Sequence, residues 1–234
     1  MAVEQYFGRD LEAMSVARNY HHWIVDEFKP YFGQTVAEVG AGCGNFSDFL
    51  LETNLKRLIS FEPSENMYGM LREHMKDNAR VETVQGYFGD HCKEYAAALD
   101  SAVYVNVMEH VPDDKAELLH VHGALKPGGH VLIFVPALQW LYSDFDKKIG
   151  HFRRYHKDRL ASLVTSAGFT IQKIKYMDIC GILPWLIAFK WLKLSMSGGK
   201  VSLYDTLVVP PERFLEELFE PPIGKNLLLV ARKD

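Results

Sequence analysis

The sequence lacks the marks of several protein classes. It has only three cysteines among 234 residues, widely spaced and odd in number, which predicts no disulfide framework and a reducing compartment. A formal net charge of −4 argues against a nucleic-acid partner, which normally leaves a basic footprint. We see no apolar run long enough to cross a bilayer and no secretory signal pattern at the start. We therefore expect a cytoplasmic protein with no nucleic-acid partner and no transmembrane segment.

Internal repeats and low-complexity segments are also absent. A chain of 234 residues is long enough for one large domain with a full hydrophobic core. We expect a single domain over residues 1–234, made of an N-terminal helical part (1–34), a ligand-binding core (35–178) and a final part (179–234) that ends on a strand.

What the sequence does contain is a glycine-rich turn between an expected strand and an expected helix. Residues 36–39 form a short apolar run of the kind that buried parallel strands show, and residues 45–51 are apolar at helical spacing. Gly40, Gly42 and Gly44 lie between them. This arrangement presents backbone N–H groups and the positive end of a helix to a ligand, and glycine lets the ligand approach the backbone.

The spacing of this turn is E-x-G-x-G-x-G, beginning at Glu38, and differs from the G-x-G-x-x-G of dinucleotide sites. A second expected strand, residues 56–61, leads into Glu62 and Pro63. A carboxylate roughly 20 residues past a glycine turn can accept hydrogen bonds from both ribose hydroxyls. The alternative is a solvated Glu62 that caps the next helix. Together the two motifs predict an adenosine-containing cofactor.

From residue 36 onward, expected strands and helices alternate. This order predicts right-handed βαβ units and a parallel sheet covered on both faces, which is a doubly wound α/β fold. Further strands are expected over residues 80–84, 101–105, 131–135, 169–176 and 227–231.

Three motifs resemble those of the class I S-adenosylmethionine (SAM) dependent methyltransferases: the E-x-G-x-G-x-G turn, the stretch NVMEHVPDD at 106–114 and the Lys-Pro-Gly-Gly turn at 126–129. The resemblance runs from about Tyr20 to the C-terminus. It implies a mostly parallel seven-stranded sheet with an antiparallel last strand, an N-terminal helical lid and a helical insertion before that strand. It also implies SAM as the cofactor and a small-molecule acceptor.

The resemblance further implies where the cofactor binds. Tyr87 and Phe88 stand where many members carry an acidic residue for adenine, so we expect stacking or a backbone contact there. Tyr20, in a helix expected over residues 10–29, lies over the cofactor; alternatively it anchors that helix to the sheet together with Trp23. The predicted cofactor residues are Tyr20, Glu38, Gly40, Gly42, Gly44, Glu62, Pro63, Met67, Gly86, Tyr87, Phe88, Asn106, Val107 and His110.

Residues 136–158 lie outside the common core, and their D-x-x-x-G-H-x-R-R-Y pattern resembles a subgroup of bacterial methyltransferases. We expect this segment to hold the acceptor, because paired arginines suit a carboxylate or a phosphate. The alternative is a solvated, charged turn. His151 is the candidate general base, needed if the acceptor is a neutral hydroxyl or a protonated amine. The predicted acceptor residues are Tyr142, Arg153, Arg154 and Tyr155.

The apolar stretch 179–196 contains a proline and two lysines and is too short for a transmembrane helix. A helix that lines an acceptor pocket or forms a homodimer contact is favoured only slightly over plain core packing. His120 and His122 fall in an expected helix, where residues two apart face different sides, so we expect no metal site.

The sequence therefore predicts methyl transfer from SAM to an oxygen or nitrogen of a small molecule that bears a carboxylate or a phosphate. A nicotinamide-dependent oxidoreductase is one alternative, although it predicts the absent G-x-G-x-x-G turn. A non-catalytic SAM-binding protein is the other.

Overall fold

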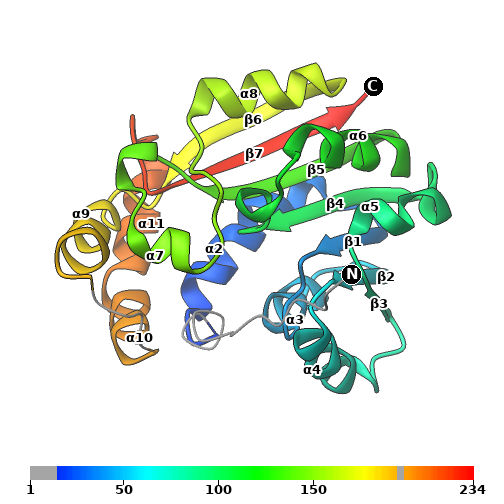
Figure 1. Cartoon of the computed structure of the whole chain (residues 1–234), viewed down its shortest axis with the longest axis horizontal. Coiled ribbons are helices and arrows are strands. Elements are labelled where there is room, and N and C mark those ends of the chain that lie inside the picture. Colours follow the sequence, from blue (N-terminus) through cyan, green and yellow to red (C-terminus); the bar gives the residue numbers. More distant parts are fainter. Residues whose placement is uncertain (1–14, 194–197) are drawn as a thin grey trace.

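The computed structural model describes residues 15–193 and 198–234. It contains a seven-stranded sheet in the order β3-β2-β1-β4-β5-β7-β6 (Figure 1). The first five strands are parallel, and β7 runs antiparallel to both β5 and β6. This confirms the predicted doubly wound sheet and its antiparallel last strand. The strands are β1 Thr35–Val39, β2 Arg57–Glu62, β3 Val81–Gln85, β4 Leu99–Val105, β5 Leu125–Pro136, β6 Phe169–Met177 and β7 Asn226–Lys233.

Helices cover both faces of the sheet: α5, α6 and α8 lie on one side, and α2, α3 and α4 lie on the other (Figure 1). Two further helices, α10 and α11, pack against α2. The helices are α2 Arg18–Phe28, α3 Asn45–Leu51, α4 Glu65–Met75, α5 Phe88–His91, α6 Asp114–Ala124, α7 Asp144–Lys148, α8 Lys157–Ser166, α9 Ile182–Trp185, α10 Gly198–Leu207 and α11 Val209–Leu218.

Successive side chains of each strand point to opposite faces, so the sheet forms two separate apolar clusters. Ala37 and Ile59 face α6 and α8, whereas their neighbours Val36 and Leu58 face α2 and α3. Burial on both faces explains why the strands read as continuous apolar runs in the sequence.

A residue far along the chain caps the first turn of α2. The N-cap residue, Ala17, has no side-chain oxygen, and the Asp205 carboxylate of α10 takes its place. It accepts hydrogen bonds from the backbone N–H groups of Asn19, at 3.1 Å, and Tyr20, at 2.8 Å. A negative charge at this end also suits the helix dipole. Helix α10 therefore fixes the N-terminal helix in place.

Tyr20 and Trp23 hold α2 against the sheet. The Tyr20 hydroxyl donates to Asp178 at 2.8 Å and accepts from the Asn226 amide at 2.5 Å. The Trp23 ring is buried and packs edge-on against Tyr20. This is the anchoring alternative from the sequence; contact of Tyr20 with the cofactor stays a prediction. Residues 10–14 of the expected helix lie outside the described residues.

The apolar stretch after Ile179 does not form one regular helix. Helix α9 contains Pro184 in its first turn, where helices tolerate proline, and passes into a π-helical turn over Leu186–Trp191. Across residues 15–193 and 198–234, none of the helices combines the length and the apolar character needed to cross a bilayer.

We predict that Asp205→Ala lowers the free energy of unfolding by about 1–2 kcal/mol, because two backbone N–H groups of α2 lose their cap. Urea unfolding measures this, and hydrogen exchange should accelerate in the first turn of α2. Asp205→Asn keeps an acceptor oxygen and should lose less. Asp77→Ala, at an exposed carboxylate in the turn after α4, is the control. Unchanged stability of Asp205→Ala would contradict the capping role.

Candidate active site

The glycine turn lies at the carboxyl end of β1, where open α/β sheets bind ligands. Gly40, Gly42 and Gly44 have φ angles of +74°, +58° and +92°, which residues with a side chain rarely adopt. A Cβ atom on Gly40 would lie 2.5 Å from a methyl carbon of Val107. Glycine at position 40 therefore lets the turn lie directly against the loop that follows β4.

Glu62, at the end of β2, is held against this turn. One carboxylate oxygen accepts from the N–H of Gly42 and the other from the N–H of Ser64, both at 2.8 Å. Burial raises the pKa of Glu62, and these two hydrogen bonds act in the opposite direction. Each oxygen can still accept another hydrogen bond. A fixed pair of acceptors beside a glycine turn fits the two ribose hydroxyls of an adenosine cofactor.

Glu38 connects the elements that flank the glycine turn. Its carboxylate is buried and accepts from the hydroxyls of Ser47, at 2.5 Å, and Ser60, at 2.9 Å. Burial raises the pKa of Glu38 to about 7, although both serine hydrogen bonds oppose the shift. These bonds link β1, β2 and α3. A direct contact of Glu38 with the cofactor stays a prediction.

The predicted adenine residues differ in exposure. Gly86, with a φ angle of +142°, turns the chain after β3, and Tyr87 is 57% exposed. Phe88 is 1% exposed and its ring packs edge-on against Phe61, with the ring centres 5.1 Å apart. This burial argues against stacking of adenine on Phe88, and stacking on Tyr87 stays a prediction.

Two other predicted residues flank Glu62. Pro63 is half-buried at the start of the loop into α4, and Met67 is buried in the first turn of that helix. Their contact with the cofactor stays a prediction.

Asn106 turns the chain sharply after β4. Its φ angle of +54° lies in the left-handed region, which asparagine adopts more readily than most residues. A short 3₁₀ turn over Met108–His110 follows at once. Val107, which lies against Gly40, immediately precedes this turn, and the turn carries Glu109 and His110.

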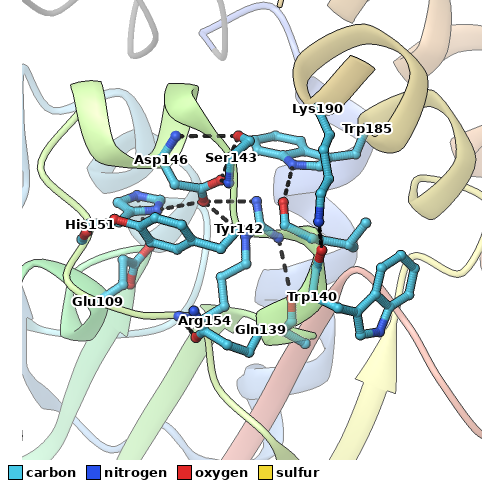
Figure 2. Close-up of polar contacts among 12 residues, drawn as sticks. Glu109, Gln139, Trp140, Tyr142, Ser143, Asp146, His151, Arg154, Trp185 and Lys190 are labelled. Atoms are coloured by element: carbon cyan, nitrogen blue, oxygen red, sulfur yellow. Dashed lines mark hydrogen bonds and ion pairs between the residues drawn. The ribbon is translucent and has the colours of Figure 1, made fainter.

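Glu109 and His110 meet His151, which comes from the segment after β5 (Figure 2 shows Glu109 and His151). The His151 Nε2 atom is 3.7 Å from a carboxylate oxygen of Glu109, and the two histidine rings have centres 4.6 Å apart. Glu109 is fully buried, and burial raises its pKa to about 7. Burial, with the charge of His151, lowers the pKa of His110 to about 3.

Asp146 orients His151 from the other side (Figure 2). One carboxylate oxygen lies 3.0 Å from the His151 Nδ1 atom and accepts from the Arg154 Nε–H at 2.9 Å. The other accepts from the backbone N–H and the hydroxyl of Ser143, at 2.9 and 2.8 Å. Burial alone would raise the pKa of Asp146, but His151, Arg154 and Ser143 outweigh it and lower the pKa. The imidazole is therefore held in one orientation.

Both predicted acceptor arginines form ion pairs inside the protein. Arg153 donates to Asp114 at 2.7 Å and to the carbonyl of Pro112. Arg154 is 2% exposed, pairs with Asp146, and stacks over the Trp185 ring. These pairings argue against the prediction that the guanidinium of Arg153 or Arg154 binds an anionic group of the acceptor.

The other two predicted acceptor residues also make internal contacts. Tyr155 is buried and its hydroxyl donates to the carbonyl of Met108 at 3.0 Å. Tyr142 donates to the carbonyl of His151 at 2.6 Å. The segment from Tyr142 to Tyr155 therefore holds the Met108–His110 turn in position.

The contacts of His151 with Glu109 and Asp146 were not predicted from the sequence. Glu109 was read only as part of the family motif. A signal for Asp146 was present: Ser143-x-x-Asp146 forms a capping box at the start of α7, and that box fixes the carboxylate that reaches His151.

We predict that Glu62→Ala weakens binding of S-adenosylhomocysteine about ten- to a hundredfold, because two charge-assisted hydrogen bonds to ribose are lost. Calorimetry measures the affinity, and a melting curve shows whether the glycine turn survives. Glu65→Ala, three residues along in α4 and exposed, should bind normally. Unchanged affinity of a folded Glu62→Ala variant would remove this residue from the cofactor site.

Comparisons with known proteins show the family and the fold of this chain. Residues 15–174 match a family model described as a methyltransferase domain. A ubiquinone biosynthesis O-methyltransferase of Vibrio parahaemolyticus is 23% identical over 111 residues, which are 47% of each chain. The corresponding Cronobacter sakazakii protein is 26% identical over 110 residues, 47% of this chain and 45% of its own. The chain thus matches about half the length of these curated relatives.

Solved structures show the same fold. A SAM-dependent methyltransferase of Thermotoga maritima, described as a possible histamine N-methyltransferase, has a TM-score of 0.64 at 19% identity, covering 97% of this chain and 96% of its own. The Haemonchus contortus phosphoethanolamine N-methyltransferase 2 has a TM-score of 0.66 at 17% identity. The match covers 98% of this chain and 58% of the Haemonchus contortus chain. From the family match and the fold, this chain belongs to the methyltransferase-domain family and has the class I architecture of the SAM-dependent enzymes.

Proposed function

We propose that this chain transfers the methyl group of SAM to a hydroxyl oxygen of a small-molecule acceptor. The observation that carries the proposal is the row of side chains Asp146, His151 and Glu109, which starts two residues after Val107, the residue that lies against Gly40 of the glycine turn. When bound, SAM supplies a methyl group already activated by its sulfonium. The protein then has to align the acceptor, which can contribute about 7–11 kcal/mol, and to receive the hydroxyl proton.

His151 is placed to receive that proton. Its Nδ1 atom lies 3.0 Å from the Asp146 carboxylate, which favours the tautomer with a proton on Nδ1. The Nε2 atom is then free to accept a proton from a hydroxyl. Asp146 stabilises the imidazolium that forms, as the carboxylate does in other carboxylate–histidine pairs. An oxygen acceptor also agrees with the O-methyltransferase names of the curated relatives.

A carboxylate or phosphate on the acceptor would meet Lys147 here instead of the two arginines, because Lys193 pairs with Asp144 at 2.6 Å and Lys190 donates to the carbonyl of Trp140. A hollow of about 290 Å³ lies beside Tyr142 and is lined by Lys147, Lys190 and Lys193 together with Ser143 and Asp144. Tyr142 links this hollow to the segment that carries the proposed base, because its hydroxyl donates to the backbone carbonyl of His151. We therefore place the anionic group of the acceptor in this hollow.

Transfer of labelled methyl from SAM to panels of phenols, catechols, alcohols and amines tests the proposed reaction. We predict that at least one hydroxyl compound is methylated and that His151→Gln lowers kcat about 10²–10⁴-fold, because a positioned base is lost. His156→Gln, at an exposed histidine of the same segment, should keep full activity. Methylation of amines alone, or full activity of His151→Gln, would contradict the proposal.

The lysine hollow gives a separate prediction. Lys147→Ala should raise KM for an anionic acceptor about three- to tenfold and leave its KM for SAM unchanged, because an exposed charge contributes roughly 1 kcal/mol. Lys148→Ala is the matched control: its side chain is also exposed but does not line the hollow. Equal KM values for the two variants would place the anion elsewhere.

A further inference from the structure

Glu109 has a feature that base catalysis by His151 leaves unexplained. Its side chain is fully buried, yet neither carboxylate oxygen forms a hydrogen bond with any residue that the structure describes. Buried polar groups are normally paired, because an unpaired carboxylate loses its hydration without compensation. The nearest charged group, His151 Nε2, is 3.7 Å away, beyond normal hydrogen-bond length. The carboxylate is thus positioned for a partner of a different kind.

We propose that Glu109, His110 and His151 bind one divalent transition-metal ion. One carboxylate oxygen and one nitrogen from each imidazole lie within 4.8 Å of one another. Ligands placed 2.0–2.2 Å from a common ion lie about 3–4 Å apart, so small side-chain rotations bring all three atoms into range. Two imidazoles and a carboxylate suit Zn²⁺, Mn²⁺ or Fe²⁺ and leave coordination positions open for another oxygen ligand.

The groups behind the histidines support this assignment. Metal-binding histidines usually donate their second N–H to a carboxylate or a backbone carbonyl. His151 has Asp146 at 3.0 Å from Nδ1, which directs Nε2 toward Glu109 (Figure 2). His110 has a hydrogen bond to the backbone of Gly150. Each of the two rings is therefore held in its orientation by a hydrogen-bonding partner.

The ligands come from two distant segments, and this explains why their spacing gave no metal signal. Glu109 and His110 follow β4, whereas His151 lies beyond β5. The pair that the sequence analysis considered, His120 and His122, lies in helix α6, as expected. The adjacent Glu109 and His110 alone are not a metal signal, and nothing in the local sequence links them to His151.

The ion would also act on the acceptor, and this part rests on the proposed function. A hydroxyl oxygen bound at an open position loses its proton more easily, because the cation stabilises the oxyanion. With the ion bound, the proton passes to solvent water and His151 is a ligand, so that His151→Gln loses activity through loss of the ion. The role of His151 as a base applies to the chain without the ion. The oxyanion forms the new bond to the methyl carbon as the carbon–sulfur bond breaks, and that electron pair stays on sulfur.

Metal binding can be measured without any acceptor. The purified full chain is stripped with a chelator and titrated with Zn²⁺ in a calorimeter, with melting curves taken in parallel. We expect one ion per chain and a raised melting temperature. Glu109→Gln and His151→Gln should each weaken Zn²⁺ binding at least a hundredfold, and Asp146→Asn about 10–100-fold. His156→Gln should bind as the unmodified chain does.

A spectroscopic measurement on the unmodified chain covers the case in which the variants do not fold. Mn²⁺ bound to the stripped protein should show pulsed electron-spin-echo modulation from two imidazole nitrogens. Its absence overturns the site, as does Zn²⁺ binding that survives Glu109→Gln. Methyl transfer that persists in the stripped protein with chelator also overturns the metal's role and leaves the proposed function standing. Metal binding with no methylation of any hydroxyl compound would support the metal site and contradict the proposed function.

Discussion

The buried ion pair between Arg154 and Asp146 is the interaction on which the rest of the site depends. The two side chains are 2% and 0% exposed. Removing one partner of such a pair typically costs about 3–5 kcal/mol, because the other charge stays buried and uncompensated. Asp146 in turn orients His151, and Arg154 reaches the Trp185 ring of the insertion after β6. This one ion pair therefore connects His151, the proposed base, to Trp185 in the insertion after β6.

The fold brings this pair to the cofactor side of the sheet. Parallel strands end at a common edge, and β1, β2 and β4 are neighbours in the sheet. The contact between Gly40 and Val107 sets how closely the glycine turn approaches the loop after β4. That loop carries Glu109 and His110. The proposed ribose ligand Glu62, after β2, and the proposed reactive cluster, after β4, are therefore separated in the sheet only by β1.

Periodicity and turn chemistry were enough to predict the strands, the glycine turn and the position of Glu62, because these features are local. Contacts between distant segments were not predictable. Nothing near Arg153 or Arg154 indicates that Asp114 and Asp146 neutralise them, and nothing near Ala17 indicates that Asp205 caps the helix. The burial of the Phe88 ring was not predictable for a similar reason: an aromatic residue after a strand can face a ligand or the core, and here the core contains Phe61 and Tyr95.

A crystal structure of the chain with S-adenosylhomocysteine tests the central claim most directly, namely that the glycine turn and the Glu109–His110–His151 cluster form one site. We expect the ribose hydroxyls within hydrogen-bond distance of Glu62 and the sulfur facing the cluster, with room between them for an acceptor oxygen. A sulfur atom that faces away from His151 would contradict the account.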